Sequence, residues 1–121
     1  MAAKIVVVRL DASGNDTVYS NVKRGRVQAI TLVYGAGSSA TADVLIEDEV
    51  SGVDLVNIAN SSADAIFYPR AQVHDSTGNV VTYDGTRPIY DKHFVSGRLK
   101  MTTTNQNTGI YVNGKVVLEV Y

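Results

Sequence analysis

The chain has 121 residues, a length that fits one domain spanning 1–121 and that can bury a core without a metal or a disulfide. It contains no cysteine, which excludes a disulfide framework, a cysteine zinc site and a cysteine nucleophile. The formal net charge is −1 and no basic stripe is visible, so we expect no nucleic acid partner.

The first expected strand covers residues 4–10, in which residues 5–8 are continuously apolar. This run is shorter than the apolar core of a signal peptide, and Arg9 and Asp11 follow it directly. We therefore expect a protein made and folded in a cytoplasm. No apolar run approaches the ~20 residues that span a bilayer, so we expect no membrane partner.

Three further strands are expected along the first half of the chain, at residues 17–22, 27–34 and 42–48. The stretch 53–59 is ambiguous. A capping-box pattern precedes it at residues 51–54, which favours one or two helical turns. Its β-branched residues Val53, Val56 and Ile58 favour a strand, which is the interpretation we adopt.

The clearest alternation lies at 66–74, where Phe67, Ala71 and Val73 share one face of the expected strand. The opposite face carries Tyr68, Arg70, Gln72 and His74. Pro69 has no N–H to donate, which places this strand at a sheet edge or marks a bulge.

Strands are also expected at 80–83, 89–95, 98–103 and 115–121. Asn113-Gly114 can close a tight hairpin between residues 110–112 and 115–117, or residues 105–114 can form one long loop. The whole pattern predicts an all-β fold, a β-sandwich or jelly roll of about eight antiparallel strands.

Two motifs are candidates for chemical sites. Residues 35–40 match G-x-G-x-x-A after a strand, but the next strand begins at once, which leaves no room for the helix that a dinucleotide site needs. Asp91 and His93 can share one face of a strand and hold a metal, which would make a metal-dependent enzyme. Neither spacing is diagnostic, so we expect no catalytic residue, no cofactor, no metal and no enzyme activity.

Tyrosines and arginines in the second half of the chain are the candidates for an interface with another chain. The predicted interface residues are Tyr68, Arg70, Tyr83, Arg87 and Tyr90. Arg87 lies between Asp84 and Asp91, so an ion pair that fixes its own loop is the alternative role for this side chain. Several strands are apolar on both faces, which predicts a homo-oligomer.

Short sequence words in residues 60–121 carry a resemblance to a known class of proteins. The words are Tyr68-Pro69-Arg70, His74-Asp75, Tyr83-Asp84-Gly85-Thr86-Arg87-Pro88 and Gly97-Arg98-Leu99-Lys100. In these the chain resembles small virion structural proteins of tailed bacteriophages. The resemblance implies a capsid decoration (cement) protein that contacts the major capsid protein or another virion protein. Together with the apolar strand faces, it predicts a homo-oligomer that is a trimer before a dimer. A tail or head–neck component and a carbohydrate-binding receptor-recognition module are the alternatives.

Overall fold

The computed structural model describes residues 4–82 and 84–120. Every regular secondary-structure element in those residues is a β-strand. The strands are β1 (Lys4–Ser13), β2 (Asp16–Val22), β3 (Gly25–Tyr34), β4 (Asp43–Asp48), β5 (Asp54–Ile58), β6 (Ala65–Phe67), β7 (Arg70–Gln72), β8 (Tyr90–Lys92), β9 (Phe94–Val95), β10 (Arg98–Thr104) and β11 (Tyr111–Val120). The all-β prediction is therefore confirmed. Within the same residues no helix is long and apolar enough to cross a membrane.

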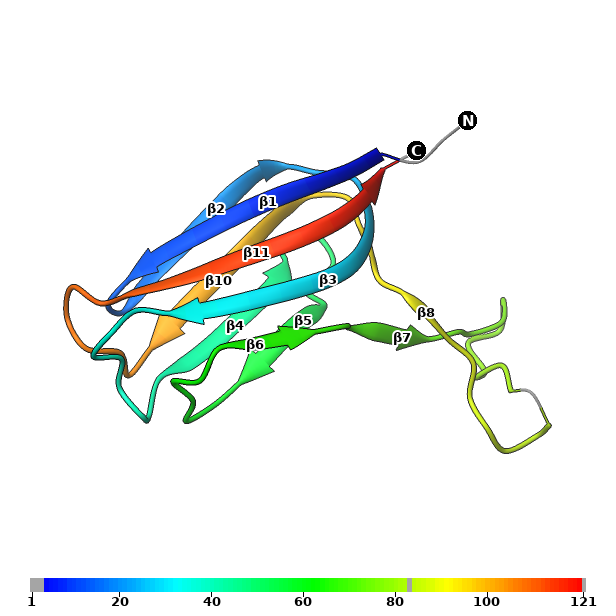
Figure 1. The fold of residues 1–121 in the computed structure, drawn as a ribbon. Coiled ribbons are helices and arrows are strands. Elements are labelled where there is room, and N and C mark those ends of the chain that lie inside the picture. Colours follow the sequence, from blue (N-terminus) through cyan, green and yellow to red (C-terminus); the bar gives the residue numbers. More distant parts are fainter. Residues whose placement is uncertain (1–3, 83, 121) are drawn as a thin grey trace.

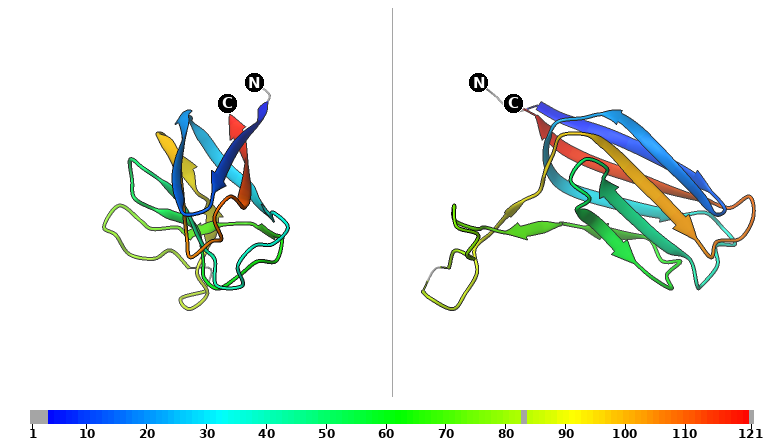
Figure 2. Two further views of the ribbon diagram at one scale, coloured as in Figure 1. Left: turned by 90° about the vertical axis from the view of Figure 1, so that its left-hand side faces the viewer. Right: turned by 180° about the vertical axis from the view of Figure 1, so that it is seen from behind.

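The strands form two large antiparallel sheets and one small one (Figure 1). The five-stranded sheet has the order β1-β11-β3-β6, and β9 also pairs with β3. The four-stranded sheet has the order β2-β10-β4-β5, and the small sheet is the pair β7-β8. Consecutive strands often belong to different sheets, so β1 and β2 lie together along one side of the molecule while β5 and β6 lie along the opposite side (Figures 1 and 2).

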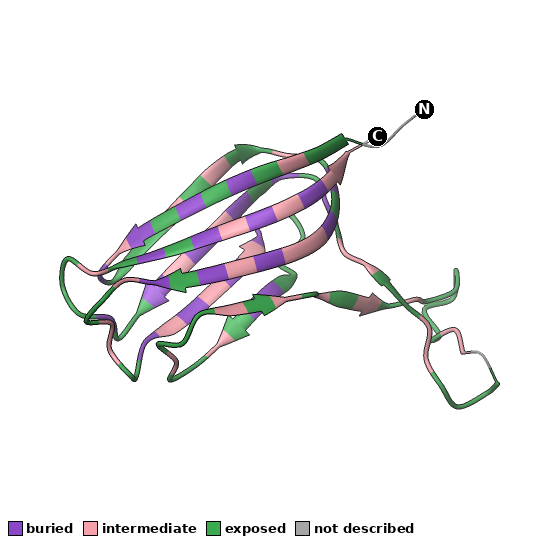
Figure 3. Ribbon diagram, in the orientation of Figure 1, coloured by how far each residue is buried: buried purple, intermediate pink, exposed green. Residues whose placement is uncertain are grey.

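One hydrophobic core joins the inner faces of the two large sheets. Alternate residues of the long strands point into it, which produces the banded burial pattern in Figure 3. Leu10, Ile30 and Leu118 come from the five-stranded sheet, while Ile46 and Leu99 come from the four-stranded sheet. The alternation predicted at 98–103 therefore corresponds to real in-and-out packing.

The hairpin predicted at Asn113-Gly114 is wrong. Both residues lie inside β11, which pairs with β1 on one side and β3 on the other. A Cβ added at Gly114 would lie 3.1 Å from Met101 Sδ and 3.4 Å from Ile46 Cδ1. The glycine thus accommodates a crowded point of the core rather than a turn. The loop between the last two strands is residues 105–110, shorter than the loop of residues 105–114 that is the other alternative.

The ambiguous stretch 53–59 is a strand, because β5 pairs with β4 over most of its length. The single strand predicted at 66–74 is wrong: β6 ends at Phe67, β7 begins at Arg70, and Pro69 lies in the break. The segment 89–95 is likewise divided into β8 and β9. Between β7 and β8, the strand predicted at 80–83 is wrong in its described part, because Val80 and Thr82 form only isolated bridges.

These breaks have a common cause, which is an insertion into one edge strand. β6 pairs with residues 30–32 of β3, and β9 pairs with residues 25–26 of the same strand in the same direction. Together they cover one edge of β3. Between them the chain leaves the sheet and returns, and its described residues 68–82 and 84–93 project from the body (Figure 2). We call residues 68–93 the arm and the rest of the described chain the body.

Candidate interaction arm

The arm has no hydrophobic core of its own. None of its described residues is buried, although Ala71, Val73, Val81 and Ile89 are half-buried. Its stem is the antiparallel pair of β7 and β8, in which Arg70 lies opposite Lys92. Two-stranded ribbons without a covering layer are only marginally stable in water. The arm therefore needs other restraints or a partner surface.

Backbone hydrogen bonds join three segments of the chain in the middle of the arm, around Val73, Val81 and Ile89. The N–H of Val73 donates to the carbonyl of Ile89 at 2.8 Å, and the N–H of Ile89 donates to the carbonyl of Val81 at 3.1 Å. The N–H of Val81 completes the ring by donating to the carbonyl of Val73 at 2.8 Å. From this junction two loops emerge, one on each side of residues 80–82. The arm therefore ends in two tips.

The first tip is organised by an aspartate. Asp75 Oδ1 accepts hydrogen bonds from the N–H and the hydroxyl of Thr77 and from the N–H of Asn79. These bonds, the Thr77 hydroxyl first, lower the pKa of the Asp75 carboxyl. Such an Asx turn fixes the loop without a core.

The second tip repeats this arrangement around Asp84. Its Oδ1 accepts from the N–H of Arg87, the N–H of Thr86 and the Thr86 hydroxyl. Its Oδ2 pairs with Arg87 Nε at 2.9 Å. The N–H of Arg87, followed by the two Thr86 groups, lowers the pKa of the Asp84 carboxyl to about 2. Both tips are thus held in defined shapes at neutral pH.

The base of the arm is fixed to the body by polar contacts. Lys92 forms an ion pair with Glu119 of β11, and the N–H of Val27 donates to the carbonyl of His93 at 2.8 Å. Arg70 Nη1 donates to the carbonyl of Gln28 at 3.4 Å. Burial, and secondarily the charge of Arg70, lowers the pKa of His93, so this imidazole is neutral at pH 7. These contacts restrict how far the arm can swing.

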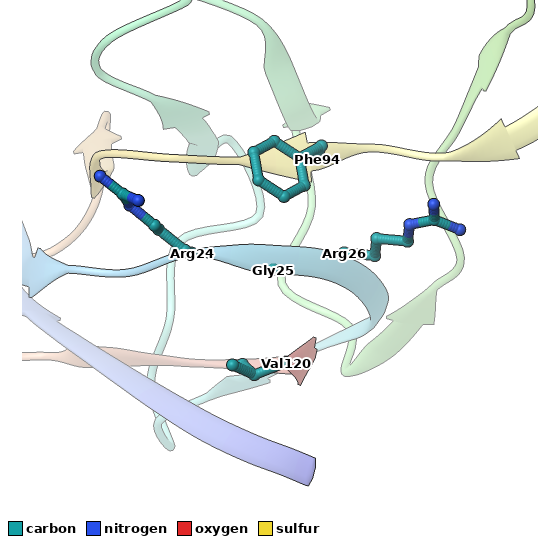
Figure 4. Close-up of a pocket in the computed structure, with 5 residues that line it drawn as sticks. All are labelled: Arg24, Gly25, Arg26, Phe94 and Val120. Carbon is teal, nitrogen blue, oxygen red and sulfur yellow. The ribbon is translucent and has the colours of Figure 1, made fainter. Parts of the chain in front are cut away.

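A shallow hollow of about 300 Å³ lies beside the arm's attachment (Figure 4). It is lined by Arg24, Gly25, Arg26, Phe94 and Val120. Phe94 has 63% of its surface exposed although it belongs to β9. An exposed aromatic side chain beside basic ones is the usual composition of a contact surface with another protein.

Four of the five predicted interface residues lie on the arm, and the fifth, Tyr83, falls outside the described residues. Tyr68 and Tyr90 are 64% and 56% exposed. Arg87 forms the ion pair with Asp84 that was its alternative role, and it remains largely exposed. Tyr68, Arg70, Arg87 and Tyr90 therefore lie on one projecting element, which the sequence did not indicate.

The structure places the two candidate chemical sites of the sequence, residues 35–40 and the pair Asp91 and His93, as follows. Residues 35–40 form a tight loop between β3 and β4, with no helix after them. Among residues 4–82 and 84–120, no group of three or more metal-ligating carboxylates and imidazoles comes together, and this includes the surroundings of Asp91 and His93.

Sequence reasoning missed one polar cluster, at the end of the body away from the arm. Gln106 is buried, and its Oε1 accepts the N–H of Ser39 and the N–H of Asn107. Its own N–H donates to Asn15 Oδ1. The cluster joins three loops, so its role is structural.

The chain matches no model of a known protein family and no curated protein sequence.

Proposed function

We propose that this protein is a virion structural protein of a tailed bacteriophage. Within that class we propose a capsid decoration protein, whose body is a β-sandwich or jelly roll and which binds and stabilises the assembled shell. The virion class rests on the sequence words in residues 60–121. Most of the described residues in those words lie on the arm, at 68–70, 74–75 and 84–88.

The observation that carries the proposal is the arm without a core. A segment with no buried residue of its own gains little by folding alone, because burial of apolar surface is the main stabilising term. Yet its two tips and its base are held by hydrogen bonds and an ion pair. An ordered projection that lacks a core is suited to fit against a second surface. In a decoration protein, that surface is the shell.

The exposed side chains of the arm match this use. Tyr68 and Tyr90 offer aromatic surface, and Arg70 and Arg87 offer hydrogen-bond donors; Tyr and Arg are enriched at the centres of protein interfaces. Each copy needs only weak affinity, because many copies bind one particle and an oligomer engages several sites at once.

The test uses capsid shells assembled without this protein. We expect the wild-type chain to sediment with the shells and Tyr68→Ala and Tyr90→Ala to bind at least about tenfold more weakly, the effect of losing an interface tyrosine. Tyr111→Ala is the matched control, because Tyr111 is 53% exposed but lies on the body. Full binding by both arm variants would contradict the role of the arm.

A carbohydrate-binding receptor-recognition module is the second candidate function. The observation in its favour is the Tyr90 ring, which is exposed and whose hydroxyl lies 3.4 Å from Gln72 Nε2. A flat ring beside an amide can stack on a sugar and bond its hydroxyls. A glycan-array signal that Tyr90→Ala abolishes would establish this function in place of shell binding.

A further inference from the structure

Charge is segregated between the two long sides of the body. Residues 27–69 contain six acidic residues and no basic one. They supply β4, β5 and the segments around them, along one side of the molecule. The opposite side is formed by β1, β2, the loop after β2 and the adjoining part of β11. Besides Asp11 and Asp16, it carries five basic residues. These are Lys4, Arg9, Lys23, Arg24 and Lys115.

The basic side contains a like-charge pair that the described chain does not neutralise. Arg9 on β1 lies directly opposite Lys115 on β11, on the outer face of the sheet. Like charges at such positions repel each other. Neither side chain forms an ion pair with any residue in the described part of the chain. An acidic group from outside would relieve this repulsion.

A groove lies beside this pair on the basic side of the body. It has a volume of about 320 Å³ and lies between β1 and β2, which are the edge strands of the two large sheets. Arg9 and Lys23 line it together with Val7 and Tyr19. Edge strands offer unpaired backbone groups to another chain. The groove therefore combines two cations with the edges of two strands, and its surface is mainly polar.

The acidic side has features that match the groove. β5 is the other edge strand of the four-stranded sheet, and it begins at Asp54, which is exposed and forms no ion pair among the described residues. Val50 and Val53, beside Asp54 in the chain, are 71% and 40% exposed. Glu47 and Glu49 are already paired with Lys100 and Arg98. Asp54 is thus the available acidic group on an apolar edge.

We propose that the β5 edge of one copy docks against the groove between β1 and β2 of a second copy, which brings Asp54 close to Arg9 and Lys23. The inference rests on the homo-oligomer within the proposed function. The two contacting surfaces are different and lie on opposite sides of the body, so the contact is head-to-tail and closes into a ring when the rotation allows. The arm stays outside this contact and is free for another partner.

The test is a charge exchange followed by analytical ultracentrifugation at micromolar concentration. We expect wild-type oligomers that dissociate as salt rises, because the Debye length falls from about 30 Å at about 0.01 M to about 3 Å at about 1 M. Arg9→Glu and Asp54→Lys should each raise the apparent dissociation constant by about tenfold or more. The double variant R9E/D54K should restore the oligomer, because each contact again joins opposite charges.

Matched controls are Arg87→Glu and Asp91→Lys, which make the same charge changes on the exposed arm. These variants should assemble as the wild type does. Wild-type monomers, single variants that assemble normally, a double variant that stays dissociated, or controls that dissociate would each overturn the proposal. Shell binding is measured separately by sedimentation, so a failed charge exchange and a failed proposed function give different results.

Discussion

At the residue scale, Gly25 lies where the backbone leaves no room for a side chain. A Cβ there would lie 2.5 Å from the carbonyl oxygen of Glu119, a backbone atom that cannot move away, and φ is +150°. We expect Gly25→Ala to lower the free energy of unfolding by about 3 kcal/mol, from backbone strain and overpacking together. Urea unfolding of the purified protein measures this loss.

Gly52 provides the control for that prediction. Its φ is also positive, at +73°, but a Cβ there would meet nothing within 4 Å. Gly52→Ala should therefore cost only the left-handed backbone penalty, about 1 kcal/mol. Equal losses at the two glycines would show that the close approach of Glu119 to Gly25 does not determine stability.

We expect the stability of the second arm tip, around Asp84, to depend on pH. The pKa of Asp84 is about 2, below the ordinary carboxyl value of 3.8, because the folded loop hydrogen-bonds the ionised form. The stabilisation of the loop is therefore complete above pH 3.8 and is lost as the pH falls through about 2. The carboxyl carbon of Asp84, followed by NMR, should titrate with a midpoint near 2.

A variant identifies the origin of that shift. Thr86→Val removes the hydroxyl that donates to Asp84 Oδ1 at 2.9 Å, so it should raise the midpoint toward the ordinary value. A wild-type midpoint near 3.8, or a midpoint that Thr86→Val does not change, would contradict the hydrogen-bonded tip.

Local turn chemistry was a partial guide at this scale. Turn chemistry is local where an aspartate bonds the N–H groups that follow it in the chain, as Asp75 and Asp84 do. It failed at Asn113-Gly114, where Met101 and Ile46, distant in sequence, crowd the glycine. The role of Gln106 also depends on distant loops, so no local signal identified it.

At the element scale, the arm is an insertion that the body does not need. The core cluster contains no residue of 68–93, and β6 and β9 already align on one edge of β3. We expect a chain in which a Gly-Ser-Gly linker replaces residues 68–92 to fold, because three residues span up to ~10 Å and the gap along β3 is short. Circular dichroism should retain its strand signal.

The deleted chain should also unfold cooperatively, with a free energy of unfolding within about 1 kcal/mol of the wild-type value, since no residue of the hydrophobic core is removed. Backbone NMR spectra should keep the dispersed signals of the body strands. A collapsed or unfolded deletion variant would show that the arm stabilises the body and is not an independent projection.

The alternation of apolar and polar residues predicted where strands occur better than it predicted which strands are continuous or pair with each other. Alternation correctly placed β10 and most of β11, because both cross the core with alternate residues buried. The same alternation at 66–74 predicted one strand, although β6 belongs to the large sheet and β7 to the arm. Pro69 marked the break, but the sequence alone does not show which strands pair.

At the scale of the whole molecule, the uneven distribution of charge along the chain is visible in the sequence. The sequence does not show that the acidic and basic segments lie on opposite sides of the body. Residues 27–69 lack any basic side chain. Only the sheet order places them on the side opposite β1 and β2. The net charge of −1 conceals this asymmetry. The molecule thus offers two complementary sides for self-association and a separate arm for another surface.

Cryo-electron microscopy of the source particle tests the central claim most directly, because it shows where the arm lies. Our account predicts copies at regular positions over the whole capsid shell, with residues 68–93 against the major capsid protein and the body facing outward. Density confined to the tail tip, or an arm that points into solvent while the body contacts the shell, would contradict the account.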